Sequence, residues 1–196
     1  MMKKYIAEMA GTFVLTFAVA LSLGGKLAFA TPLMASIVVG ILVYVMGHIS
    51  GTHINPAITV GLWSWKKIGT KDALFYVLFQ FVGAIIACFA SGALTTVPAL
   101  IVLDNWPVFL GELIGTFVLA FGVAAVVAEK VHPAASGLVI GGSLFLGISF
   151  ASFLSNGVLN PAVAMGINSF SLAYLVGPLL GGILGMQAFV MLSSRK

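Results

Sequence analysis

Charged residues are scarce in this sequence: they make up 7% of its 196 residues, whereas hydrophobic residues make up 61%. A soluble domain carries roughly 25% charged residues, so this composition excludes a water-exposed globular protein and indicates an integral membrane protein. Six spans of about 20 residues and two half-spans would use roughly 140 positions, which leaves no room for a catalytic domain outside the membrane. We therefore expect a single membrane domain over residues 1–196.

Reactive side chains are equally few. The one cysteine, Cys88, excludes a disulfide within the chain and is expected to be a small packing residue inside an apolar span. His48 and His53 lie five residues apart across an expected loop, a poor spacing for one metal site. No nucleophile, base and orienting group converge. The sequence therefore predicts no metal site, no cofactor and no enzyme activity.

What the sequence does contain is one stretch that occurs twice. Residues 50–57 read SGTHINPA and residues 155–162 read SNGVLNPA, so both end in Asn-Pro-Ala. A second duplicated stretch, residues 7–15 and 111–119, contains Glu8 and Glu112 and repeats Glu-x-x-Gly-Thr-Phe at nearly the same offset. Two motifs kept in register indicate an internal repeat, with halves at about 1–100 and 101–196.

Each Asn-Pro-Ala motif predicts the start of a short helix. Pro56 and Pro161 suit the first helical turn, where a missing amide hydrogen costs nothing, and this places Asn55 and Asn160 at the preferred N-cap position. The motifs continue through Ala57 and Ala162 into apolar segments that are too short to cross a bilayer. We expect half-helices over about residues 56–65 and 161–170.

The remaining apolar runs predict an all-α membrane protein with six full spans. The expected spans cover about residues 5–23, 33–49, 72–94, 108–128, 134–154 and 171–192. Eight of the nine basic residues then fall on the side of the two termini, and only Lys26 falls opposite. The excess of basic residues on one side predicts cytoplasmic termini in a multi-pass protein of the plasma membrane. It also accounts for the net charge of +4 without a nucleic-acid partner.

Because each half has three spans, the second half must be inverted relative to the first. The two half-helices then meet near the midplane of the membrane, where irregular backbone is tolerated only if it lines a polar cavity. Carbonyl groups before each Asn would supply acceptors there, from Gly51, Thr52 and His53 in one half and from Asn156 and Val158 in the other. Amides of Asn55 and Asn160 would supply donors. Such a path suits water and small neutral solutes, because cations would meet the positive ends of both helices.

With these motifs the sequence resembles the aquaporins, the major intrinsic protein family, over essentially its whole length. Further marks are the repeated Glu-x-x-Gly-Thr-Phe, the lead-in at residues 47–51, QFVGA at 80–84 and YLVGP at 174–178. The resemblance implies a right-handed bundle of six tilted helices, a homotetramer with a pore in every subunit, and passive conduction. It also implies that Glu8 and Glu112 accept hydrogen bonds from the re-entrant loops, and that His48 and His53 support a loop or border the pore.

The family's selectivity filter, transferred residue by residue, falls on Ala35, Ile148, Gly157 and Val163. The family nearly always has Arg at the last position, where this chain has Val163. A filter with small residues and no Arg is expected to be wide and apolar. It resembles the filters of aquaglyceroporin-like members that pass glycerol, urea or neutral hydroxides of boron and arsenic.

Two other classes of function remain as alternatives. A coupled secondary transporter also has inverted repeats and broken helices, but it would need a titratable group or an ion site near the breaks. A structural membrane protein with an inactive pore would show a blocked filter.

Glycines four residues apart, at 111 and 115 and at 177, 181 and 185, indicate close helix crossings rather than chemistry.

Overall fold

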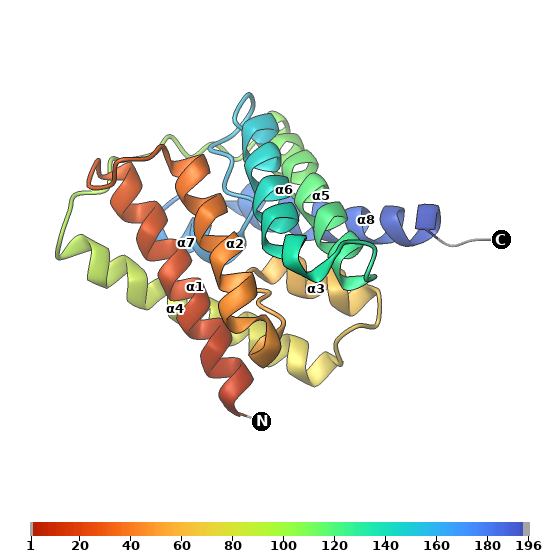
Figure 1. The fold of residues 1–196 in the computed structure, drawn as a ribbon. Coiled ribbons are helices and arrows are strands. Elements are labelled where there is room, and N and C mark those ends of the chain that lie inside the picture. The colour runs from red at the N-terminus through yellow and green to blue at the C-terminus, as the bar shows by residue number, and fades with distance from the viewer. Residues whose placement is uncertain (1, 194–196) are drawn as a thin grey trace.

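The computed structural model describes residues 2–193, and the regular structure within this range is helical (Figure 1). The helices are α1 (Met2–Leu23), α2 (Thr31–Ser50), α3 (Pro56–Ser64), α4 (Thr70–Gly92), α5 (Trp106–Val127), the 3-10 turn η1 (Pro133–Ala135), α6 (Ser136–Ala151), α7 (Pro161–Gly166) and α8 (Leu172–Ser193). Six segments are long and apolar enough to cross a membrane, while α3 and α7 are too short. The predicted fold of six spans and two half-helices is confirmed.

Most helix ends lie within a few residues of the predicted ones, but the second half-helix is shorter than expected. It ends at Gly166 because Asn168 adopts a left-handed φ of 58° and the Ser169 amide donates back to the Ala164 carbonyl at 2.8 Å. That hydrogen bond closes the helix end. Two of the basic residues counted for the topology, Arg195 and Lys196, lie outside the described residues.

The two halves of the chain interlock. Within each half, the first helix packs on the other two, as α1 does on α2 and α4 and α5 does on α6 and α8. Each half-helix packs mainly on the last helix of the opposite half: α3 lies on α8, and α7 lies on α4. Helix α2 of the first half also packs against α6 of the second half. This exchange brings both Asn-Pro-Ala loops to the centre of the molecule.

Close contact between α5 and α8 depends on a row of glycines. A Cβ atom added at Gly177, Gly181 or Gly185 would lie closer than 3.0 Å to a backbone carbonyl oxygen of α5, at Phe109, Leu113 and Phe117 respectively. The rows advance four residues at a time on both helices, so the two backbones touch along two turns. The glycine spacing seen in the sequence thus marks a helix crossing.

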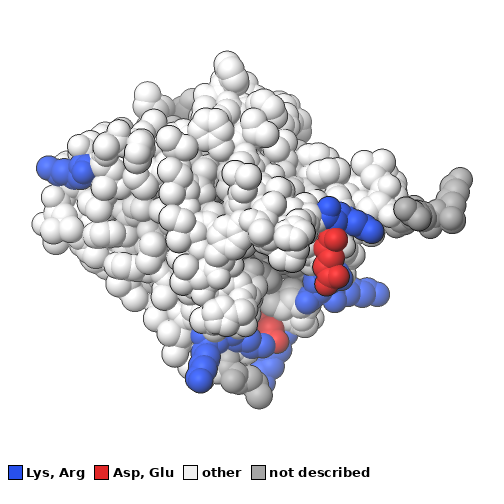
Figure 2. Space-filling model, viewed as in Figure 1, with Lys and Arg blue, Asp and Glu red and all other residues white. Residues whose placement is uncertain are grey.

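Charged side chains gather in one region of the surface. In the view of Figure 2 they cluster at the lower and right sides, one basic group lies at the opposite edge, and the surface between them is uncharged. The surface of the molecule also carries many exposed apolar side chains, such as Phe89 and Leu138. With the six long apolar helices, it shows a multi-pass integral membrane protein.

Candidate functional site

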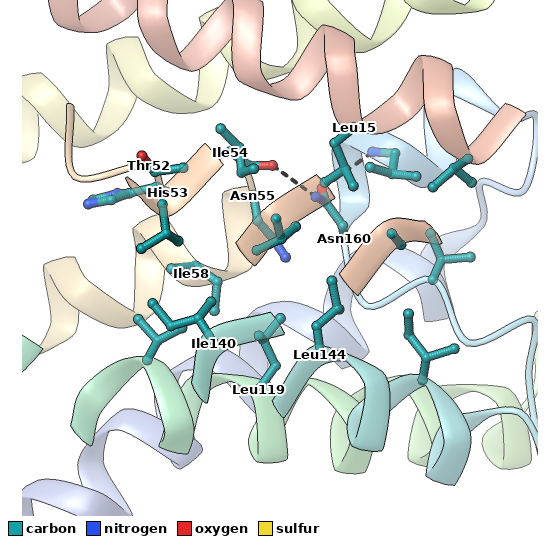
Figure 3. Close-up of a pocket in the computed structure, with 18 of the residues that line it drawn as sticks. Leu15, Thr52, His53, Ile54, Asn55, Ile58, Leu119, Ile140, Leu144 and Asn160 are labelled. Atoms are coloured by element: carbon teal, nitrogen blue, oxygen red, sulfur yellow. Dashed lines mark hydrogen bonds between the residues drawn. The ribbon is translucent and has the colours of Figure 1, made fainter. Parts of the chain in front are cut away.

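A cavity of about 760 Å³ runs through the bundle beside both Asn-Pro-Ala loops. Its lining includes residues from four of the six long helices (α1, α2, α5 and α6), from both half-helices and from the loops that precede them. Figure 3 shows Asn55 and Asn160 together at its centre, with Leu119, Ile140 and Leu144 across the cavity and Thr52 and His53 toward one end. The site is therefore a lined path in the molecular interior rather than a surface pocket.

The two asparagines hold each other's loops at this centre. Asn55 Nδ2 donates to the Leu159 carbonyl at 2.9 Å, and Asn160 Nδ2 donates to the Ile54 carbonyl at 2.9 Å. Their side-chain oxygens cap the half-helices, since Asn55 accepts from the Ala57 amide and Asn160 from the Ala162 amide. A primary amide carries two hydrogens, so each asparagine keeps one donor for a molecule in the cavity.

Both loops adopt strained backbone in matching positions. Ile54 and Leu159, which precede the asparagines, have left-handed φ values of 41° and 56°. Thr52 and Gly157, two residues earlier, have φ values of 51° and 63°. For a residue other than glycine this conformation costs about 1 kcal/mol or more. Contacts behind each loop must stabilise this strained backbone.

Glu8 supplies those contacts in the first half. This carboxylate is fully buried in α1, and Oε1 accepts from Ser50 Oγ at 2.6 Å and from the His53 amide at 3.0 Å. Its Oε2 accepts from the Ile54 amide at 2.6 Å and from Gln80 Nε2 at 2.8 Å. Four donors offset the cost of burying the charge.

Glu112 does the same in the second half. Its Oε1 accepts from Ser155 Oγ at 2.7 Å and from the Val158 amide at 3.0 Å, and its Oε2 accepts from the Leu159 amide at 2.6 Å. Neither glutamate lines the cavity. Ser50 and Ser155 are the first residues of the two duplicated stretches, so the repeat itself carries a signal for both serines.

The orientation of His53 is set by a network that has no counterpart in the second half. Thr59 Oγ1 donates to the Asn55 carbonyl at 3.1 Å and accepts from Gln80 Nε2 at 3.0 Å. Because that hydroxyl hydrogen is used, His53 Nδ1, at 3.2 Å from Thr59 Oγ1, must be the donor of their hydrogen bond. The neutral ring then presents Nε2 as an acceptor, and His53 lines the cavity.

The four residues matched to the filter all line the cavity: Ala35 in α2, Ile148 in α6, Gly157 in the second loop and Val163 in α7. All four are buried. Gly157 also has a packing reason to be glycine. A Cβ added there would lie 2.8 Å from Ser152 Oγ and 3.0 Å from the Ile148 carbonyl, so the missing side chain seats the loop against α6.

The two ends of the cavity differ. One end, which we call the basic mouth, has Tyr44, His48 and Lys67 in its lining; the opposite mouth has Thr31, Leu100 and Ser152. Asn156 also lines the cavity while its Nδ2 donates to the Ile101 carbonyl and to Ser169 Oγ. Lys67 and Leu100 were not singled out as site residues from the sequence, because neither belongs to a repeated motif.

Prolines and alanines of the motifs do not face the cavity: Pro56, Ala57, Pro161 and Ala162 are buried in the first turns of α3 and α7. Gly51 and Val158, by contrast, line it. Within residues 2–193 no group of three or more His, Cys, Asp or Glu side chains could hold a metal ion. The arrangement offers hydrogen bonds to a neutral molecule and no chemistry beyond that.

Comparison with known proteins identifies the family of the chain. The family model described as "Major intrinsic protein" matches residues 1–189. Aquaporin AqpM of Methanothermobacter marburgensis is 29% identical, with 98% of each chain covered, and aquaporin NIP2-1 of Oryza sativa is 31% identical over 96% of this chain and 70% of the relative. The X-ray structure of the aquaglyceroporin from Plasmodium falciparum has the same fold, with a TM-score of 0.79, 24% identity and 95% and 94% of the two chains covered.

A family model that covers nearly the whole chain, aquaporins among its relatives, and an aquaporin-like fold around a lined internal path all agree. The chain belongs to the major intrinsic protein family, a family of membrane channels and not of enzymes.

Proposed function

We propose that this protein is a passive channel for water and small uncharged solutes. The observation that carries the proposal is the cavity of about 760 Å³, lined by both loops and by no carboxylate among the residues that the structure describes. A neutral molecule entering it would exchange hydrogen bonds with water for bonds to loop carbonyls and to the free amide hydrogens of Asn55 and Asn160. The apolar wall opposite, with Leu119 and Leu144, offers no partner, so the solute is guided along one polar stripe.

The proposed filter, formed by Ala35, Ile148, Gly157 and Val163, has no charged or hydrogen-bonding side chain. Small side chains there leave room for solutes larger than water, and apolar surface favours contact with the carbon-bound hydrogens of a solute such as glycerol. We therefore assign glycerol, urea and neutral hydroxides of boron or arsenic to the substrate class, together with water.

The proposal also covers the support of the loops, the domain organisation, the orientation in the membrane and the assembly. Glu8 and Glu112 would hold the loops without touching the solute, and His48 and His53 would border the path. Residues 1–196 would act as one domain built from two inverted repeats. Both termini would face the cytoplasm, which places the basic mouth inside the cell, and four subunits would assemble, each with its own pore.

Coupled transport has less support than passive flow. Both buried carboxylates of the spans are bound by loop amides and serine hydroxyls, and neither lines the cavity. A coupled transporter needs a group that binds an ion or a proton in contact with the path. An inactive structural protein is disfavoured as well, because the interior holds a cavity rather than a packed core along the loops.

Proteoliposomes and stopped-flow light scattering test the proposal. We expect water, glycerol and urea permeability above that of empty vesicles, linear in solute concentration and independent of an ion gradient. Fast water flow with glycerol and urea at the level of empty vesicles would overturn the wide filter. Saturable uptake that requires a gradient would favour the transporter.

A further inference from the structure

Lys67 is the one side chain with a permanent charge in the cavity lining, counted over residues 2–193. The rest of the lining consists of apolar side chains, hydroxyls, asparagine amides, histidines and backbone. In the sequence, Lys67 counts only toward the orientation of the membrane spans. Its place at the basic mouth raises the question of what a single fixed cation does there.

The end of α3 fixes the position of Lys67. Lys66 has a left-handed φ of 59° and its amide donates to the Trp63 carbonyl at 2.9 Å, while the Lys67 amide donates to the Leu62 carbonyl at 2.9 Å. This pair of bonds is the Schellman motif, which turns the chain back over the last helical turn. Leu62 also lines the cavity, so Lys67 is folded back toward it.

The Trp65 ring contacts the ammonium group of Lys67. Lys67 Nζ lies 4.6 Å from the centroid of the Trp65 ring, a cation–π contact. Trp65 is half-buried and packs against the apolar core. A long, flexible side chain is thereby given a preferred place at the mouth.

The second half of the chain ends its half-helix in the same way but delivers no charge. There Asn168 takes the left-handed position and the Ser169 amide donates to the Ala164 carbonyl. α7 has six residues and α3 has nine, a difference of about 4.5 Å along the helix axis. Ser169 is consequently fully buried behind Asn156, whereas the longer α3 carries Lys67 out to the basic mouth.

No carboxylate of residues 2–193 lies within salt-bridge distance of Lys67. Across residues 2–193 the recorded salt bridge joins Lys4 to Asp72, not Lys67 to any partner. Further along the path, the N-termini of α3 and α7 add positive partial charge at the centre. A cation entering from the basic mouth thus meets a positive group first and positive helix ends next, while a neutral solute meets no such barrier.

We propose that Lys67 sets the charge selectivity of this pore, by repelling inorganic cations such as Na⁺ and K⁺ at the basic mouth while leaving neutral solutes unaffected. The proposal rests on the proposed channel function. It locates a selectivity element outside the filter, at the end of the cavity opposite Val163.

Cation leak through proteoliposomes tests it, measured as Na⁺ and K⁺ flux at 10 mM and 150 mM salt beside water flux. Lys67→Gln should raise the leak at 10 mM salt by about four-fold, the factor expected for removing a unit charge about 5 Å from the ion in water. The increase should shrink at 150 mM salt, where the screening length falls from about 30 Å to about 8 Å. Lys67→Arg should match the native protein.

Lys66→Gln is the matched control, because Lys66 precedes Lys67 but does not line the cavity. It should leave the leak unchanged, and both glutamine variants should keep the native water flux. An equal leak in native and Lys67→Gln protein at 10 mM salt would overturn the proposal, as would an equal rise in Lys66→Gln. If the native protein passes no water above empty vesicles, the channel function itself fails; normal water flux with an unchanged leak rejects only the role of Lys67.

Discussion

Asn55 and Asn160 each donate an amide hydrogen to the carbonyl that precedes the other, at 2.9 Å in both directions. This reciprocal pair joins the two halves of the chain where their half-helices meet. One hydrogen of each side-chain amide is bound to the protein, and the other remains for a molecule in the cavity. The same side chains therefore serve as helix caps, as the link between the loops and as donors on the path.

Replacing Asn55 by alanine should impair both stability and flux. The change removes the acceptor for the Ala57 amide and the donor to Leu159, and loss of an N-cap alone costs about 1 kcal/mol. We expect a lower melting temperature in detergent and water flux reduced several-fold in proteoliposomes.

Asn105→Ala is the matched control, because Asn105 caps α5 by accepting from the Val108 amide and does not line the main cavity. It should cost a similar amount of stability with native flux. Reduced flux of equal size in both variants would show that the effect of Asn55 comes from stability alone.

Glu8→Gln should destabilise the first loop. One oxygen that accepts hydrogen bonds becomes an NH₂ group facing donors, and a buried donor left without a partner costs about 1–3 kcal/mol. The melting temperature of the purified protein should fall, and the exposed Glu129→Gln should leave it unchanged. If the Glu8→Gln protein were as stable as the native one, the carboxylate would not be what stabilises the loop.

The sequence predicted the features that occur twice. The repeat located both Asn-Pro-Ala loops, and the apolar runs located the six spans, because hydrophobic length is a strong constraint in a membrane. That Glu8 and Glu112 bind the loops was expected only from the family resemblance, and the hydrogen bonds now give the physical reason.

Features that occur once were missed. Thr59 and Gln80, which orient His53, correspond in the second half to apolar or small residues, so the repeat carries no signal for them. The position of Lys67 depends on α3 being one turn longer than α7, and helix length near a glycine or left-handed turn is poorly defined by sequence. Both depend on tertiary contacts rather than on local pattern.

Gly181→Ala should weaken the contact between α5 and α8. The added Cβ would collide with the Leu113 carbonyl, and overpacking of this kind costs about 1–3 kcal/mol. Gly142→Ala is the matched control, because a Cβ at Gly142 in α6 meets no atom within 4 Å. We expect a lower melting temperature for the first variant and an unchanged or higher one for the second, since alanine favours a helix. Equal melting temperatures would show that α5 and α8 separate at little cost.

Val163→Arg should convert the proposed wide filter into a narrow, cationic one. Val163 is 3% exposed and lines the cavity, so the longer side chain must extend along the path. We expect glycerol flux to fall about ten-fold, which corresponds to about 1.4 kcal/mol of added barrier, with a smaller loss of water flux. A fixed cation about 4 Å from the path also adds about 4 kcal/mol against a permeating cation at an effective dielectric of 20, so any cation leak should fall too.

Val163→Met separates size from charge, because methionine is long but neutral. It should lower glycerol flux and leave the cation leak at the native level, whereas arginine lowers both. Solute permeability and cation leak measured on the same vesicles give the comparison. If Val163→Arg changed neither quantity, the side chain at this position would not face the path, and the filter would have to be formed by other residues of the lining.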